Sequence, residues 1–138
     1  MLANLKGPAL EAALARHPGS YRRIGYGLLA VALLGLVVLE YARHTVGWWP
    51  PVAFGAGPDL ALLLGAGAGL ARGQLHPRAV PLYNLLHRFW GPLALGVVAV
   101  AAGLSAAWVV GALAWALHVA IDRAAGYGLR TPDGFQRS

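Results

Sequence analysis

Four long apolar runs, separated by short polar segments, account for most of the chain after residue 20. The runs cover approximately residues 24–41, 51–71, 79–102 and 104–122. Each approaches the roughly 20 residues that an α-helix needs to cross a bilayer core about 30 Å thick. Strands are not expected, because the chain lacks period-two alternation and a closed barrel needs many more segments. The pattern predicts an all-α membrane protein, a bundle of four transmembrane helices with short loops.

Two of these runs contain residues that disturb a helix. Gly57-Pro58 lies in the middle of the second run, and Pro92 lies in the third. Proline removes a backbone donor, so each position is expected to bend or break its helix. The second run also places Gly65 and Gly69 four residues apart, a spacing that lets helix backbones approach closely. Packing within one chain is the simpler interpretation, and a homo-oligomer formed through these glycines is the alternative.

The composition supports the membrane interpretation. Hydrophobic residues make up 58% of the chain and charged residues only 12%, where a soluble domain carries about 25% charged residues. The formal net charge is +6, and most basic residues flank the same ends of the runs. They are Lys6, Arg16, Arg22, Arg23, Arg72, Arg78, Arg123, Arg130 and Arg137. Because only Arg43 lies in the first loop, the positive-inside rule places both termini in the cytoplasm. Topology, rather than nucleic-acid binding, therefore explains the charge.

The N-terminal residues 1–20 are expected to form a leader outside the single transmembrane domain of residues 21–138. Residues 8–16 are amphipathic and begin with a proline, so this segment is interpreted either as a helix on the cytoplasmic surface or as an unordered leader. A cleaved signal peptide over residues 21–42 is a further alternative. It is disfavoured, because the apolar run is long and no Ala-x-Ala site follows it. The absence of cysteine excludes disulfides, thiolate metal sites and cysteine nucleophiles.

Polar residues inside the third and fourth runs are the candidates for chemistry. Ionisable groups are costly in hydrocarbon, so they usually face a partner, a cavity or a site. In the fourth run His118 and Asp122 lie four residues apart and therefore share one helix face. The remaining members of the predicted polar cluster are Tyr83, Asn84, His87, Arg88 and Arg123. The two arginines are interpreted as snorkelling or as pairing with Asp122.

The depth of each candidate follows from the helical rise of about 1.5 Å per residue. Counted from Arg78, His87 should lie about 13 Å above the inner boundary, and His118, counted back from Arg123, about 8 Å above it. These two imidazoles can therefore converge, with Asp122 at the cytoplasmic rim. Asp59 should lie about 20 Å above the boundary if its helix is continuous, too far to share an ion with Asp122. It is a second-rank candidate, which a break at Gly57-Pro58 would bring closer.

Two imidazoles and a carboxylate suit a divalent ion such as zinc. In this hypothesis His87 and His118 are ligands, Asp122 is a ligand or a base, and the reaction is metal-assisted hydrolysis with His118 and Asp122 as the catalytic pair. Two alternatives use the same residues. One is a hydrogen-bonded network that holds the helices together, and the other is a pathway or binding site for protons or small solutes. Phosphate-binding loops and serine-nucleophile signatures are absent from the sequence.

Several short motifs accompany these residues. They are Trp48-Trp49, Pro58-Asp59-Leu60, Tyr83-Asn84-x-x-His87 with Gly91-Pro92-Leu93, and His118-x-x-x-Asp122-Arg123-x-x-Gly126-Tyr127-Gly128-Leu129-x-x-Pro132-x-Gly134-Phe135. With these motifs the chain resembles a family of small bacterial membrane proteins, domain of unknown function family 4260. The resemblance spans roughly residues 24–136. It implies a multi-pass protein of the bacterial plasma (inner) membrane, whose partner is the lipid bilayer and whose biochemical function is unassigned.

A looser similarity concerns bacterial inner-membrane proteins labelled metal-dependent hydrolases. It rests on an early Pro-Asp, then a histidine, then His-x-x-x-Asp followed by glycine. The second histidine usual in that pattern is missing near His87. By analogy, the similarity implies that Asp59, His87, His118 and Asp122 are metal ligands.

Overall fold

The computed structural model describes Gly7 and residues 18–137, which form helices, turns and one isolated β-bridge. The N-terminal leader predicted for residues 1–20 lies almost entirely outside the described residues. The elements are α2 (Pro18–Arg43), α3 (Trp49–Ala56), the 3₁₀ turn η1 (Gly57–Asp59), α4 (Leu60–Leu64), the 3₁₀ turn η2 (Pro77–Ala79), α5 (Val80–Leu86), α6 (Trp90–Ala101) and α7 (Ala106–Ala125). The described part of the chain is thus all-α.

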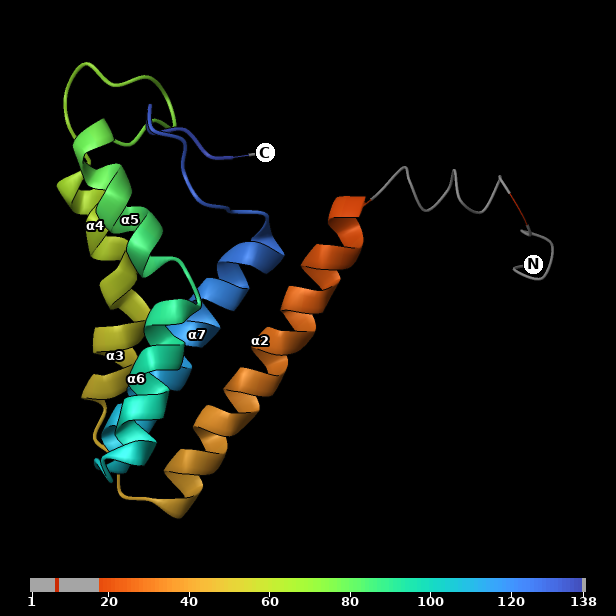
Figure 1. The fold of residues 1–138 in the computed structure, drawn as a ribbon, viewed down its shortest axis with the longest axis vertical. Helices are drawn as coiled ribbons and strands as arrows, with labels where there is room; N and C mark the ends of the chain where they lie inside the picture. The colour runs from red at the N-terminus through yellow and green to blue at the C-terminus, as the bar shows by residue number, and fades with distance from the viewer. Residues whose placement is uncertain (1–6, 8–17, 138) are drawn as a thin grey trace.

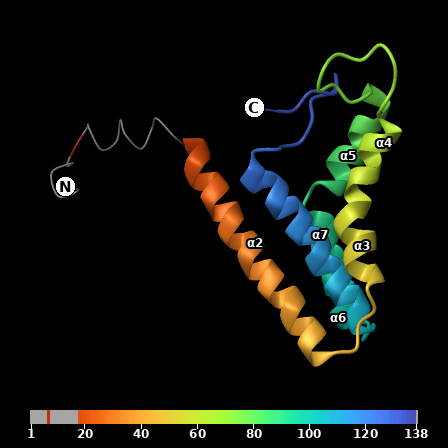
Figure 2. The same ribbon diagram turned by 180° about the vertical axis from the view of Figure 1, so that it is seen from behind.

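Helix α7 is the central element of the fold. Helices α2, α3 and α6 all pack against it (Figures 1 and 2). Helices α2 and α7 are long and apolar enough to cross a membrane, whereas α6 is shorter. The guanidinium of Arg23, near the start of α2, donates to the Ala124 carbonyl near the end of α7. The two long helices therefore run antiparallel, with the start of α2 beside the end of α7.

The expected disturbances at the prolines are confirmed as breaks in both helices. Helix α3 stops at Ala56, and the 3₁₀ turn η1 holds Pro58. Helix α5 stops at Leu86 and α6 begins at Trp90. Pro92 lies in the first turn of α6, where its missing N–H leaves the carbonyl four residues earlier without its helical donor. That carbonyl lies within the break itself.

The second apolar run differs from its expected course, because helical structure ends at Leu64 rather than at residue 71. Residues 65–76 form a loop. Gly65 packs inside the chain, since a Cβ there would come within 2.1 Å of the Leu75 side chain. Gly69 has a φ of +78° in the loop. The two glycines therefore do not share a helix face, and association of copies through them stays a prediction.

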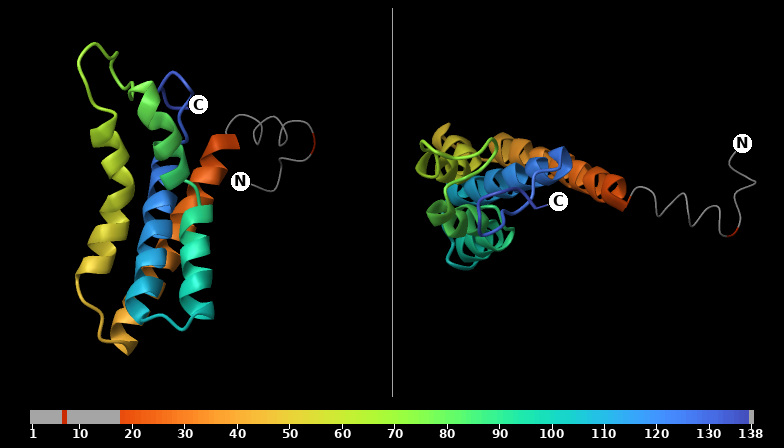
Figure 3. Two further views of the ribbon diagram at one scale, coloured as in Figure 1. Left: turned by 60° about the vertical axis from the view of Figure 1, so that its left-hand side comes forward. Right: turned by 90° about the horizontal axis from the view of Figure 1, so that it is seen from above.

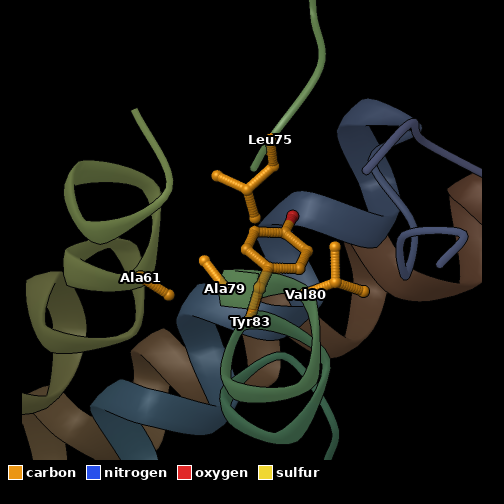
Figure 4. Close-up of a cluster of buried hydrophobic side chains, with 5 residues drawn as sticks. All are labelled: Ala61, Leu75, Ala79, Val80 and Tyr83. Atoms are coloured by element: carbon orange, nitrogen blue, oxygen red, sulfur yellow. The ribbon is translucent and has the colours of Figure 1, made fainter. Parts of the chain in front are cut away.

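One end of the molecule is built from α4, α5, the 65–76 loop and the C-terminal tail (Figures 1 and 3). A small apolar cluster holds these segments together (Figure 4), and its members are Ala61, Leu75, Ala79, Val80 and Tyr83. The tail is fastened to α5, where Asn84 exchanges two hydrogen bonds with the Arg130 backbone, at 2.7 and 3.0 Å. A turn at Pro132-Asp133-Gly134 is closed by the Gly134 N–H, which donates to the Thr131 carbonyl.

Aromatic side chains gather at the opposite end of the molecule. The ring of Trp49 lies 5.8 Å from that of Trp108, and Phe54 packs edge-on against Trp108 at 6.1 Å. Glu40 pairs with His44 at this end, at 3.6 Å. The basic residues gather at the other end of the molecule, away from these aromatic side chains. Most of them lie around the start of α2, the end of α7, the 65–76 loop and the tail.

Candidate metal centre

Four ionisable side chains from three parts of the chain converge near the break between α5 and α6. The Nε2 atoms of His87 and His118 lie 3.3 Å apart. Asp59 Oδ1 is 3.5 Å from each of these nitrogens. Asp122 Oδ2 is likewise 3.5 Å from each of them. The convergence of the two imidazoles expected from their depth is present, and Asp59 joins them.

The two breaks place the ligands from the second and third apolar runs. Asp59 is the last residue of η1, and His87 directly follows the last residue of α5. His118 and Asp122 project from one face of the continuous helix α7. Broken helices commonly form the binding sites of membrane proteins, because they bring backbone and side-chain polar groups together within the membrane.

Side chains of α7 satisfy carbonyls that the second break leaves without helical donors. The indole Nε1 of Trp115 donates to the Leu86 carbonyl at 2.7 Å. Arg123 Nη2 donates to the His87 carbonyl at 2.6 Å. A buried carbonyl left without a donor costs about 1–3 kcal/mol, so these bonds stabilise the break. Arg123 therefore supports the backbone of a ligand and forms no ion pair with Asp122 among the described contacts.

Replacing Trp115 by phenylalanine should lower the free energy of unfolding by about 1–3 kcal/mol, because the Leu86 carbonyl loses its donor while the aromatic ring is largely kept. Thermal denaturation in detergent measures the effect. Trp90→Phe is the matched control, since the Trp90 side chain is 74% exposed. Equal changes in the two variants would contradict a supporting role for the Trp115 hydrogen bond.

The orientation of His87 is fixed on both sides of its ring. Its Nδ1 donates to the Tyr83 carbonyl at 2.8 Å, so its Nε2 carries the lone pair that faces the cluster. The ring also stacks on that of Tyr83, with centroids 3.9 Å apart. The Arg130 guanidinium lies 4.9 Å from the Tyr83 ring centroid on the tail side. Arg130 is a buried positioning residue that the sequence did not single out for this role.

The spacing of the donor atoms fits a small divalent ion. In a tetrahedral zinc site with bonds of about 2.0–2.1 Å, ligand atoms lie about 3.3–3.4 Å apart. The Asp59, His87 and His118 donor atoms form a triangle with sides of 3.3, 3.5 and 3.5 Å. Asp122 Oδ2 lies at the same 3.5 Å from both nitrogens and forms a second triangle on the shared His87–His118 edge. The residues present can therefore hold a metal ion with a fourth position left for another ligand.

A family model for a domain of unknown function, DUF4260, matches residues 26–138. The chain belongs to this family. No curated protein and no solved structure matched the chain. All four converging residues of this DUF4260 protein lie within the matched region.

The other members of the predicted cluster in this DUF4260 protein have separate roles. Tyr83 packs on His87, as described above, while Asn84 binds the tail rather than the histidines. Arg88 is exposed and makes no side-chain hydrogen bond or ion pair among the contacts of residues 18–137. It lies beyond the end of α5 at Leu86, so it does not continue the helix face that carries Asn84.

Asp59 lies closer to the two histidines than a continuous helix would place it, as the expected break at Gly57-Pro58 allows. The helix that follows Asp59 ends at Leu64, and the chain then turns through a loop. Asp59 is consequently only five residues from the helix end. The break at Pro58 also interrupts the helical path, which places the carboxylate against the two imidazoles.

Proposed function

We propose that this protein is an integral membrane metalloprotein in which Asp59, His87 and His118 bind a divalent ion such as zinc. The proposal rests on one observation, the near-equilateral triangle of donor atoms with sides of 3.3–3.5 Å. Two imidazoles and one carboxylate are typical of catalytic zinc sites, which keep an open fourth position.

The hydrogen-bonding capacity of the cluster favours an ion over a purely structural network. In the neutral ring His87 Nε2 is an acceptor, because Nδ1 of the same ring donates to a carbonyl. Ionised carboxylates of Asp59 and Asp122 only accept hydrogen bonds. The Nε2 of His118 therefore supplies at most one proton to three facing acceptors, at 3.3–3.5 Å. A divalent cation satisfies these acceptors together.

Hydrolysis is the reaction class that this centre supports best. A divalent ion there would polarise a carbonyl or phosphoryl oxygen and acidify a bound water. We assign Asp122 the role of accepting a proton or orienting the water, since its carboxylate faces both ligand nitrogens at 3.5 Å and shares only the His87–His118 edge with the triangle that holds the ion. Its side chain is 20% exposed, which allows a proton to leave the centre.

The surroundings of the centre favour a substrate with an apolar group. A cavity of about 240 Å³ is lined by Pro58 and Leu86, the neighbours of two ligands, and by Trp115. The Asp59 side chain is 51% exposed, so the centre is open on its side. A membrane-associated substrate would place its apolar part in the cavity and its reacting group at the ligands.

The membrane part of the proposal rests on α2 and α7, which are long and apolar enough to span. We place the shorter α3 and α6 beside them in the bilayer, with the basic end in the cytoplasm according to the positive-inside rule. The metal centre then lies near the cytoplasmic side, because His118 and Asp122 occupy the last two turns of α7. The resulting protein would be a multi-pass protein of the bacterial inner membrane.

Elemental analysis of protein purified in detergent tests the metal assignment. The protein is first loaded with zinc and then dialysed to remove unbound ions. The wild type should retain about one zinc ion per chain, and His118→Ala should retain almost none. His44→Ala is the matched control, because that imidazole lies at the opposite end and pairs with Glu40. A metal-free wild type after this dialysis would contradict the proposal. It would favour the structural network if His118→Ala also unfolded at a much lower temperature.

A further inference from the structure

A second polar cavity lies between the start of α2 and the end of α7. It has a volume of about 390 Å³, and its lining includes the guanidinium-bearing residues Arg22, Arg23, Arg123 and Arg137. No carboxylate belongs to its lining. None of these arginines forms an ion pair within residues 18–137. The cavity therefore concentrates positive charge without an acidic side chain in its lining.

Two of the four arginines are held in place by the end of α7. Arg23 donates to the carbonyls of Ala124 and Ala125, at 2.8 and 3.2 Å. Arg123 donates to the Tyr127 carbonyl at 3.0 Å. These bonds fix the guanidinium groups without neutralising their charge. Arg22 and Arg137 are exposed and complete the basic lining.

An apolar groove lies next to this cavity. The Tyr26 ring, which lines the basic cavity, stacks on the Phe89 ring at 6.0 Å. Phe89 in turn lines a groove of about 730 Å³ between α6 and α7, where Gly96 and Ala116 leave room. The stacked pair thus separates a basic compartment from an apolar one.

We infer that these two compartments bind one anionic glycerophospholipid, with its phosphate among the arginines and an acyl chain in the groove between α6 and α7. Basic pockets between helices on the cytoplasmic side of a membrane commonly bind anionic headgroups. A guanidinium group pairs with phosphate through charge-assisted hydrogen bonds. The inference rests on the membrane placement proposed above, and it does not require a bound metal ion.

Native mass spectrometry of the detergent-purified protein tests the inference with two lipids that share the same chains. Dioleoyl-phosphatidylglycerol should bind at least about ten-fold better than dioleoyl-phosphatidylcholine, which has no net charge. The double variant Arg22→Gln/Arg137→Gln should bind both lipids alike. Arg72→Gln/Arg78→Gln is the matched control, because it removes the same charge from exposed loop positions outside the cavity. This control should keep the wild-type preference.

Two further measurements separate the possible outcomes. Ala116→Leu fills the groove and should reduce phosphatidylglycerol binding several-fold. In the wild type, sn-glycerol 3-phosphate should displace phosphatidylglycerol only weakly. Full metal content in Arg22→Gln/Arg137→Gln would show that the variant is folded and that the metal centre is separate. Equal binding of the two lipids by the wild type would overturn the inference. Competition by glycerol phosphate as strong as by the whole lipid would also overturn it, in favour of a soluble phosphate.

Discussion

Replacing Asp59 by alanine is expected to weaken zinc binding by at least about 100-fold, because it removes one of the three ligands. The stability of the fold should change little. The Asp59 side chain is 51% exposed, and its carboxylate contacts only the two imidazoles among the described ion pairs. Competition with a chromophoric chelator measures the affinity, and thermal unfolding of the metal-free protein measures the stability.

The matched control for this variant is Glu40→Ala. Glu40 also pairs with a histidine, His44, but at the other end of the molecule. Its removal should leave the zinc affinity unchanged. Asp122→Ala gives the comparison inside the centre, where a smaller loss is expected because the proposal assigns Asp122 to the bound water and Asp59 to the ion. A wild-type affinity in Asp59→Ala together with complete loss in Asp122→Ala would overturn the ligand assignment.

The convergence of His87 and His118 could be predicted from the sequence. Each residue lies only a few positions from a basic residue at the end of its apolar run, so an error in the helical path has little room to accumulate. The pairing of His118 with Asp122 follows from helical spacing alone, and α7 is continuous over both residues. The breaks near Pro58 and Pro92 were also predictable, since proline removes a specific backbone donor.

The place of Asp59 could not be predicted, because it depends on where the second helix ends. An apolar, glycine-rich stretch such as residues 65–71 is compatible with a helix or with a loop. The loop forms because Gly65 packs closely on Leu75 and because the His76 N–H donates to the Gly65 carbonyl at 2.8 Å. These contacts are tertiary, so local spacing carries no sign of them.

The role of Arg130 was missed for a similar reason. In the sequence it is one of several basic residues after the last helix, where a solvated side chain is the usual interpretation. In the structure its Nη1 donates to the carbonyls of Gly73 and Gly134, at 2.9 and 2.7 Å. The available signal was the density of turn-forming residues around it. That signal predicts a turn but does not identify the surface against which the turn packs.

Replacing Gly134 by alanine should destabilise the protein by at least about 3 kcal/mol, since it combines backbone strain with the loss of a buried hydrogen bond. Gly134 has a φ of +97°, and a Cβ there would lie 1.8 Å from the Leu75 carbonyl oxygen. Because the obstructing atom belongs to the backbone, the tail must separate from the loop. The bond from the Leu75 N–H to the Gly134 carbonyl, at 2.9 Å, would then be lost. Thermal and denaturant unfolding in detergent measure the change.

Gly69→Ala isolates the effect of this contact. Gly69 has a similar φ of +78°, but nothing lies within 4 Å of the added Cβ. Gly69→Ala should therefore lower the free energy of unfolding only by the cost of the left-handed backbone conformation, about 1–2 kcal/mol.

Gly134→Ala should also weaken zinc binding by about ten-fold, because Arg130 packs over Tyr83, and Tyr83 stacks on the ligand His87. If both variants lost the same stability and kept wild-type zinc affinity, the tail would have no part in positioning the metal centre.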